Sequence, residues 1–318
     1  MNKKCLYCYG ELSQDDQFDY HPKCSLAFFG TKIPPSLNYS LSEMNELAKK
    51  VVSSHIAVPG VQPKLSLSLI DETLNKVNLK RLTVVGALGG NYIFKPPSTT
   101  YPEMPENEHV TMKIAEAFGI QTVPSSLIRL GSGELSYITK RIDRTSDGHK
   151  IHMLDMFQIT EAVDKYKSTM ERVGKALGQY SADTLLDKLR YFEMVVFCYL
   201  TGNNDMHLKN FSMIQKDGTW VLSPAYDLLN VNLANPSDHE ELALNMEGKK
   251  RKFTLHHFER FGANLGLNNK QIQGVFNRFL KKQPKAKNLI EESFLSQEAK
   301  GNYSKIMEQK YKQLTGDK

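Results

Sequence analysis

The sequence predicts an α+β fold whose strands and helices are segregated into two parts. Up to about residue 144 the clearest patterns are short apolar runs, and residues 65–69 alternate strictly between Leu and Ser. Beyond that point, apolar residues recur at helical spacing in one segment after another. A chain of 318 residues is long enough to bury a core in each part. We therefore expect a strand-rich lobe over residues 1–144 and a helix-rich lobe over residues 145–318.

Glycine- and proline-marked turns divide the first part into strands. The expected strands are residues 65–69, 76–85, 91–95, 127–130 and 135–142. The glycine-rich residues 86–90 are interpreted as a hairpin turn, because an apolar strand follows them where a phosphate-binding loop requires a helix. Residues 131–133 give a second hairpin turn, and residues 110–118 form an amphipathic helix.

Helical periodicity dominates the second part. The expected helices are residues 153–162, 170–179, 182–201, 255–265, 270–281 and much of 291–314. Residues 211–214 and 220–222 are short strands around a turn at 216–218, and residues 232–241 are expected to form a long surface loop.

Composition excludes several classes of protein. Hydrophobic residues make up 40% and charged residues 24% of the chain, as in ordinary globular proteins. No apolar run is long enough to span a bilayer, and no secretory signal follows the first lysines, so we expect a cytoplasmic protein without a membrane partner. The net charge of +6 is modest. The basic runs at 249–252 and 281–287 are interpreted as solvated faces, and no direct nucleic-acid binding is predicted.

The polar cluster at residues 202–210, Gly-Asn-Asn-Asp-Met-His-Leu-Lys-Asn, is the strongest functional signal. Asp205 and Asn210 have the separation of the catalytic Asp and Asn in protein-kinase catalytic loops. Asp227 follows beyond the predicted hairpin. Phosphoryl transfer needs a carboxylate to orient a hydroxyl and oxygen ligands for Mg²⁺. We interpret Asp205 as the catalytic base and Asn210 and Asp227 as the Mg²⁺ ligands. The alternative is an ordinary polar loop, in which Asn, Asp, Gly and His occur only because such residues favour turns.

Two further residues of this cluster are candidates. Lys209 could screen the charge of the transferred phosphoryl group. His207 is counted among the nucleotide-site candidates, although the favoured interpretation is a hydrogen bond from its ring to the loop backbone.

Lys95 closes an apolar strand ahead of the predicted helix. A strand Lys paired with a helix Glu orients the ATP phosphates in kinases, and Glu108 is the first choice of partner, with Glu106 as the alternative. A solvated edge lysine is the competing interpretation. Further on, the backbones of Arg141 and Ile142 are candidates for adenine binding.

Asp143 follows these two residues and is a candidate ligand of the ribose hydroxyls.

Three of the four cysteines lie near the N-terminus, within segment 5–24. Cys5, Cys8, His21 and Cys24 form two pairs with the spacing of a zinc site. The alternative is a set of reduced thiols beside a small apolar cluster. Zinc is thus a candidate cofactor beside ATP and Mg²⁺.

Together these motifs resemble the HipA family of serine/threonine protein kinases, in particular the short HipT-type toxins. The resemblance rests on residues 60–64, 94–96, 106–109, 202–210 and 225–228. It implies a two-lobed protein-kinase-like fold with an ATP- and Mg²⁺-dependent kinase activity. It also implies a toxin that phosphorylates a protein substrate such as an aminoacyl-tRNA synthetase and is restrained by antitoxin proteins.

The resemblance assigns residues 53–64 to a phosphate loop that includes Gln62 and Lys64 and carries autophosphorylated serines. This chain departs from its relatives there, because Val58 and Pro59 stand where HipT-type proteins have serines. We expect Ser54 to be the autophosphorylated residue, with Ser53 as the alternative.

Two other functions compete with a protein kinase. One is a small-molecule kinase of the aminoglycoside or choline type, which uses similar Asp and Asn residues. The other is a catalytically silent pseudokinase that acts as an adaptor. The joint presence of Lys95, Asp205, Asn210 and Asp227 favours an active enzyme.

Overall fold

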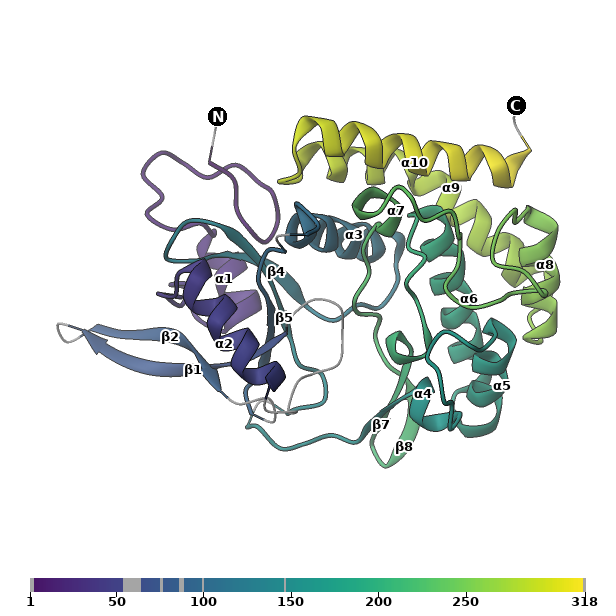
Figure 1. Cartoon of the computed structure of the whole chain (residues 1–318), viewed down its shortest axis with the longest axis horizontal. Coiled ribbons are helices and arrows are strands. Elements are labelled where there is room, and N and C mark those ends of the chain that lie inside the picture. The colour runs from purple at the N-terminus through teal and green to yellow at the C-terminus, as the bar shows by residue number, and fades with distance from the viewer. Residues whose placement is uncertain are drawn as a thin grey trace. The chain divides into compact units, whose positions relative to one another are not determined.

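The structure is a computed structural model that describes residues 3–53, 64–74, 77–85, 89–98, 100–145 and 147–316 (Figure 1). It divides into two units. The first consists of Met1–His109, Val123–Lys150 and Glu292–Phe294, and the second of Val110–Thr122, Ile151–Glu291 and Leu295–Lys318. This division crosses the chain near the predicted boundary at 144, but it also assigns residues 110–122 to the helical unit.

The first unit is built on an antiparallel sheet of five strands in the order β2-β1-β3-β5-β4. The strands are β1 (Leu65–Leu74), β2 (Val77–Val85), β3 (Tyr92–Lys95), β4 (Ser125–Arg129) and β5 (Leu135–Lys140). All five lie within or close to the predicted strand segments. Lys95, at the end of β3, pairs in register with Tyr137 of β5.

Two helices and the N-terminal segment complete the core of the first unit. Helix α1 spans Pro22–Phe29 and α2 spans Leu41–Ser53. Phe28 is fully buried with Phe94 and Ile138 of the sheet, and Leu6 of the N-terminal segment belongs to the same apolar cluster. Burying these apolar side chains stabilises a segment that has little regular secondary structure of its own.

Helix α3 (Met104–Phe118) passes from the first unit into the second, whose first residue on the helix is Val110. It starts six residues before the predicted segment, since Pro105 is well tolerated in a first helical turn. In the second unit, Thr111 bonds the hydroxyl of Tyr303 at 2.9 Å, and Phe118 packs on Phe197 and Phe279.

The second unit is mainly helical. Its longer helices are α5 (Met170–Tyr180), α6 (Thr184–Leu200), α8 (Leu255–Asn264), α9 (Asn269–Glu292) and α10 (Gln297–Thr315). Helix α6 is the central one: every residue from Tyr191 to Leu200 is buried. Its Phe192 packs against Phe261 of α8 and Phe276 of α9. Helix α6 therefore gives the loop that follows it a rigid base.

A small antiparallel sheet in the order β6-β7-β8 lies in the same unit. It comprises β6 (Met153–Asp155), β7 (Ser212–Lys216) and β8 (Thr219–Leu222), so the hairpin predicted at residues 211–222 is present. The helix predicted over residues 153–162 is wrong. Residues 153–155 instead pair with β7, and the Asp155 side chain caps the four-residue helix α4 (Met156–Ile159).

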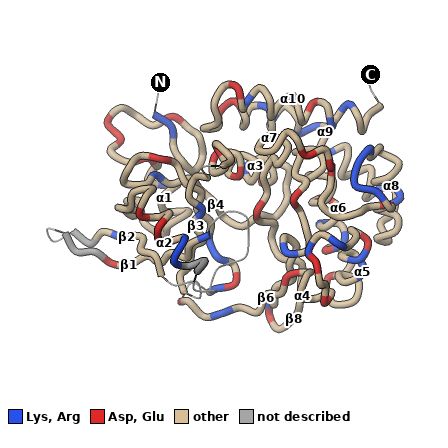
Figure 2. The backbone as a smooth tube through the Cα atoms, viewed as in Figure 1, with Lys and Arg blue, Asp and Glu red and all other residues tan. Residues whose placement is uncertain are grey.

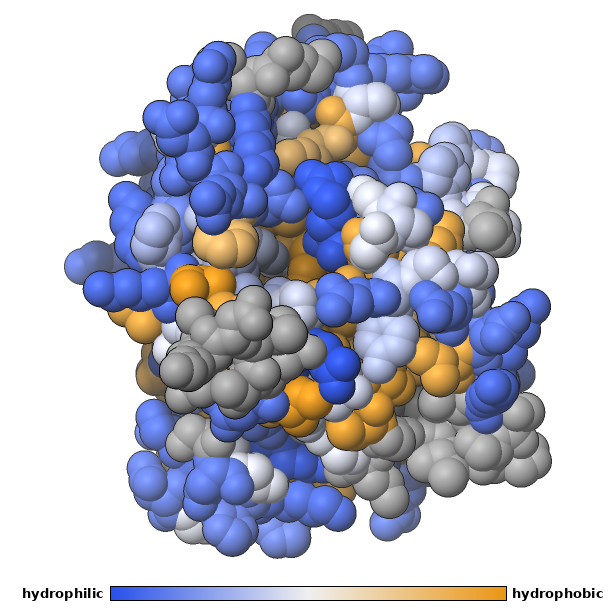
Figure 3. All heavy atoms as spheres, turned by 90° about the vertical axis from the view of Figure 1, so that its left-hand side faces the viewer, coloured by the Kyte–Doolittle hydropathy of each residue, from blue (hydrophilic) through white to orange (hydrophobic). Residues whose placement is uncertain are grey.

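Among the described residues, no helix is both long and apolar enough to cross a bilayer. Figure 2 shows basic and acidic segments interspersed along most of the chain, with one basic stretch, residues 249–252, beside α8. On the face shown in Figure 3, hydrophilic residues predominate and hydrophobic ones form small patches.

Candidate active site

The loop after α6 holds the predicted catalytic cluster. The helix ends at Leu200, and Gly202 follows with a φ of 68°, a left-handed conformation that glycine adopts without strain. A Cβ there would lie 2.9 Å from Oδ1 of Asn230, so the close approach of this segment also requires glycine. The Gly202 carbonyl accepts hydrogen bonds from the amides of Val231 and Asn232. These contacts fix the point at which the polar loop begins.

Asp205 is half-buried in this loop and is oriented by a residue that the sequence did not point to. The hydroxyl of Tyr166 donates a hydrogen bond of 2.7 Å to Oδ1 of Asp205. Burial, then the hydrogen bond to Asp205 and its charge, raise the pKa of Tyr166 well above its ordinary value. The phenol therefore stays protonated and remains a donor. No sequence motif surrounds Tyr166, which reaches the loop only through the tertiary fold.

Asn210 ends the short 3₁₀ helix η1 (Leu208–Asn210) and is buried. Its side-chain Nδ2 donates a hydrogen bond of 2.9 Å to the backbone carbonyl of Asp205. This bond assigns the amide group, because the nitrogen faces the loop and Oδ1 is the atom left for another ligand. An amide oxygen is a donor that Mg²⁺ accepts. The predicted Asp and Asn are thus joined within one turn.

Asp227 has a φ of 59°, an uncommon conformation for a residue with a side chain. The neighbouring residues hold it there. The Tyr226 hydroxyl donates a 3.0 Å hydrogen bond to the carbonyl of Lys209 and lies 2.5 Å from the Ser212 hydroxyl. The Ala225 amide bonds the Gln121 carbonyl at 2.7 Å. The segment that carries Asp227 is therefore tied to the residues on either side of Asn210.

His207 lies close to both carboxylates. Burial lowers its pKa below the ordinary 6.5, although the charges of Asp205 and Asp227 act in the opposite direction. The ring packs edge-on against Tyr166, with centroids 5.0 Å apart. Its Nδ1 has no hydrogen-bond partner among the described residues.

Lys209 is half-buried, and its Nζ lies 4.8 Å above the ring centre of Phe157. A cation–π contact of this kind gives the side chain a defined place beside the loop.

Lys95 and Glu108 form a buried ion pair in the first unit. Nζ lies 2.6 Å from Oε1 and 2.7 Å from Oε2, and the two residues are 4% and 2% exposed. Removing both charges from water is costly, and only a close, two-pronged geometry offsets that cost. Lys95 is therefore not a solvated edge residue. Its Nζ also lies 5.4 Å from the ring centre of Tyr137.

Glu106, the alternative partner, has a different environment. Burial raises its pKa to about 7, and the charge of Glu103 adds to the effect. A carboxyl group beside a lysine would show the opposite shift. Glu108 is therefore the ion-pair partner of Lys95.

The segment predicted to bind the nucleoside is already engaged in part. The Arg141 amide bonds the Asn91 carbonyl at 2.8 Å, so it is not the donor for an adenine. The Arg141 guanidinium makes two hydrogen bonds to Asp143, of 2.9 and 2.6 Å, and Arg144 adds a third. Burial would raise the pKa of Asp143, but the two arginines outweigh it and lower that pKa. The backbone of Ile142 stays a candidate for adenine binding.

Most of the predicted phosphate loop lies outside the described residues. This holds for Gln62 and Ser54, whereas Ser53 is the last residue of α2 and its side chain is not described. Lys64 precedes β1 and is half-buried.

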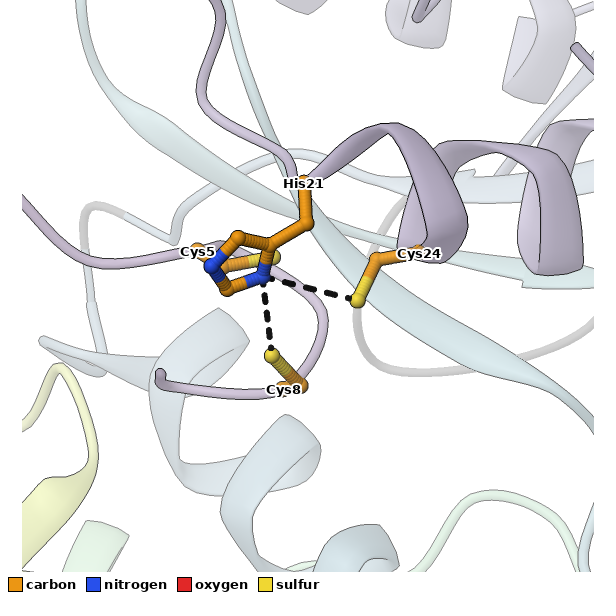
Figure 4. Close-up of side chains that lie close together, drawn as sticks. All are labelled: Cys5, Cys8, His21 and Cys24. Carbon is orange, nitrogen blue, oxygen red and sulfur yellow. Dashed lines mark hydrogen bonds between the residues drawn. The ribbon is translucent and has the colours of Figure 1, made fainter. Parts of the chain in front are cut away.

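Two other features of the described residues are chemically distinctive. Cys5, Cys8, His21 and Cys24 are brought together, with their ligand atoms all within 4.8 Å of one another (Figure 4). A surface pocket of about 430 Å³ lies between α5, α6 and α8 and includes Lys175, Lys188 and Phe261. None of the predicted site residues lines that pocket.

The chain resembles a known protein family and proteins of two bacteria. The model of the HipA-like C-terminal domain matches residues 56–287, which include all the candidate catalytic residues. A protein of Haemophilus influenzae named "Putative kinase" is 28% identical over 293 residues, covering 83% of this chain and 82% of that protein. Another, "Putative kinase Y4dM" of Sinorhizobium fredii, is 35% identical over 182 residues. That match covers 52% of this chain and 44% of the relative, so the chain spans less than half of that protein.

Two solved structures share the fold. HipA of Shewanella oneidensis, in a complex with HipB and operator DNA, superposes with a TM-score of 0.66 at 19% identity, covering 85% of this chain and 71% of that one. The Helicobacter pylori proinflammatory kinase CtkA gives a TM-score of 0.53 at 15% identity, covering 79% and 94% respectively. The predicted α+β, kinase-like fold is thereby confirmed.

Proposed function

The chain belongs to the family with a HipA-like C-terminal domain, and from this premise we propose that it is a serine/threonine protein kinase that uses ATP and Mg²⁺. The observation that carries the proposal is the loop at residues 202–210. One hydrogen bond there joins the Nδ2 of Asn210 to the backbone of Asp205, so the amide oxygen is the atom left for another ligand. This is the arrangement that a phosphoryl-transfer loop needs.

Each residue has a role that its surroundings support. The Asp205 carboxylate accepts the proton of the substrate hydroxyl, and Tyr166 fixes the orientation of that carboxylate. Oδ1 of Asn210 and the carboxylate of Asp227 are hard oxygen donors suited to Mg²⁺. Lys95, held by Glu108, places a positive charge for the ATP phosphates. Bound Mg²⁺ would neutralise the charge that develops on the transferred phosphoryl group.

Transfer of the γ-phosphate from labelled ATP to proteins of a cell lysate tests the activity. Asp205→Asn, Asn210→Ala and Asp227→Asn are each expected to lower transfer by orders of magnitude, because these residues act as a unit. The control is Asp217→Asn, an exposed residue of the β7–β8 turn. Equal transfer by wild type and Asp205→Asn would refute the proposed kinase.

We further propose that the kinase is the toxin of a toxin–antitoxin system. Support comes from the structural likeness to HipA, a toxin whose solved complex contains HipB. The proposed substrate class is a translation component such as an aminoacyl-tRNA synthetase, and the proposed partner is an antitoxin protein. Induced expression of wild type should stop growth, whereas Asp205→Asn should not. Normal growth on expression of an active wild-type enzyme would count against the toxin role and leave the kinase activity standing.

Autophosphorylation of Ser54, or of Ser53 as the alternative, is proposed as the regulatory step. A phosphate near the nucleotide site would place negative charge where the ATP phosphates bind. Intact-protein mass spectra of wild type, Ser54→Ala and Ser53→Ala test this proposal. Ser54→Ala is expected to carry one phosphate fewer, and an unchanged count in both variants would refute it.

A further inference from the structure

The N-terminal cysteine and histidine cluster is separate from the residues proposed for phosphoryl transfer. Cys5 and Cys24 are buried and Cys8 and His21 half-buried, and Figure 4 shows all four side chains pointing toward one another. We propose that these residues bind one structural zinc ion through three thiolates and one imidazole. The family model begins at residue 56, so the cluster lies outside the region that it matches.

The distances within the cluster fit a tetrahedral ion. Tetrahedral zinc has Zn–S bonds of about 2.3 Å and Zn–N bonds of about 2.0–2.1 Å, which place sulfur and nitrogen about 3.5 Å apart. The Sγ atoms of Cys8 and Cys24 lie 3.4 and 3.7 Å from Nδ1 of His21. These two sulfur–nitrogen pairs therefore already have about the separation that a shared ion would impose, and all four donors lie within 4.8 Å of one another.

The second nitrogen of His21 supports the same assignment. Its Nε2 lies 2.9 Å from the backbone carbonyl of Glu11, which can only accept a hydrogen bond. Nε2 must therefore carry a proton in that contact, so the neutral form of the ring has its lone pair on Nδ1, the nitrogen that faces the thiols of Cys8 and Cys24. A metal-binding histidine usually donates its other N–H in this way.

Local backbone structure presents the ligands in two pairs. Between Cys5 and Cys8 the chain turns back, because the Cys5 amide bonds the Gly10 carbonyl and the Tyr9 amide bonds the Cys5 carbonyl. A Cβ on Gly10 would lie 3.2 Å from the His21 ring and 3.4 Å from the Cys8 sulfur. Glycine thus leaves room for the cluster. His21 and Cys24 stand at the start of α1, one helical turn apart.

The alternative of ordinary buried thiols explains the cluster less well. A buried thiol gains by packing against apolar groups, as Cys198 does within α6. Three thiols and an imidazole converging on one point form a polar arrangement instead. None of the described cysteines is in a disulfide. Soft thiolates with an imidazole favour zinc over Mg²⁺ or Ca²⁺.

The ion would fix a segment that has little regular secondary structure. Residues 3–21 form only an isolated bridge between Lys4 and Glu11 among their described parts. The Tyr9 hydroxyl, next to ligand Cys8, lies 2.9 Å from Nδ1 of His109. His109 directly follows Glu108, the partner of Lys95. The zinc site thereby supports the turn of α3 that carries the ion pair.

Metal content of the full chain, purified without a metal-affinity resin, tests the proposal. Mass spectrometry for metals should give about one zinc per chain, and a chelator competition should show that Cys8→Ser and His21→Ala weaken zinc binding about 100-fold or more. His21→Cys supplies a fourth thiolate and should retain the ion. Cys198→Ser, the matched control in the helical unit, should also retain it.

Cobalt provides a second readout that does not depend on enzyme activity. Co²⁺ added to the chelated wild type should give the intense visible bands of tetrahedral coordination together with sulfur-to-metal charge transfer, and His21→Cys should shift them. Zinc well below one per chain with no tetrahedral cobalt spectrum would overturn the proposal. So would zinc binding that is unaffected by Cys8→Ser, or a disulfide among the three cysteines of the purified protein.

Discussion

Tyr166 places its hydroxyl 2.7 Å from Oδ1 of Asp205, although 39 residues separate them in the chain. The Tyr166 ring also packs against His207, and the carbonyl of its neighbour Lys165 accepts a hydrogen bond from the Leu208 amide at 3.2 Å. The loop is thus supported from outside its own sequence. Tyr166 engages one oxygen of Asp205, and in the proposed kinase the other oxygen would accept the hydrogen bond of the substrate hydroxyl.

We expect Tyr166→Phe to lower kcat about tenfold with little change in KM for ATP. A hydrogen bond to a charged group contributes about 1.5–3 kcal/mol, and the partial exposure of Tyr166 places its effect at the lower end. Initial rates at saturating and limiting ATP separate the two parameters. Tyr180→Phe, on an exposed tyrosine at the end of α5, is the control. An unchanged kcat would mean that Tyr166 does not position the base.

Because Lys95 and Glu108 form a buried ion pair, we expect that substitutions of the two residues can restore stability without restoring activity. Lys95→Met removes the positive partner of the buried Glu108 carboxylate, which should cost about 3–5 kcal/mol of unfolding free energy. The double variant Lys95→Met with Glu108→Leu should recover much of that stability while activity stays absent. Denaturant unfolding and ATP turnover measured on the same samples check both outcomes. Recovery of activity in the double variant would contradict the role of Lys95 at the phosphates.

The sequence predicted those parts of the site that local patterns encode. The order of Lys95, Glu108, Asp205, Asn210 and Asp227 follows from residue type, spacing and flanking strands or helices. The sequence did not predict the contacts that only the tertiary fold creates.

Two such contacts are the Tyr166 hydrogen bond and the engagement of Asp143 by Arg141 and Arg144. The same limit explains the error at residues 153–155. Their apolar spacing suits a helix, but pairing with β7 decides their structure.

The raised pKa of Glu106 predicts that the stability of the folded chain depends on pH. Burial raises its pKa from 4.5 to about 7 in the folded chain, so the folded state holds its proton more tightly than the unfolded state does. Stability contributed by this group is therefore full below pH 4.5, declines as the pH rises through 7, and stays lost above it. The shift corresponds to about 3 kcal/mol at most.

Glu106→Gln should flatten this decline and make the variant more stable than wild type at pH 8.5, with a much smaller difference at pH 4.5. Unfolding midpoints in denaturant across this pH range give the comparison. Glu46→Gln, on an exposed residue of α2, serves as the control for removing one carboxylate. Parallel curves for wild type and Glu106→Gln would show that the Glu106 carboxyl is not perturbed by burial.

We expect that a single methyl group added at position 202, just after α6, disturbs the candidate catalytic loop. An alanine there would have to adopt a φ of 68°, and its Cβ would lie 2.9 Å from Oδ1 of Asn230 and 3.0 Å from Oδ1 of Asn232. Gly202→Ala should therefore cost about 2 kcal/mol or more and lower kcat, because the loop must shift to relieve the contacts.

Gly266→Ala is a matched control: its φ is 88°, but no heavy atom lies within 4 Å of its Cβ. It should cost only the backbone strain, about 1 kcal/mol, with kcat unchanged. Equal losses of stability and of kcat in both variants would mean that backbone strain alone, and not the close approach of Asn230, requires the glycine.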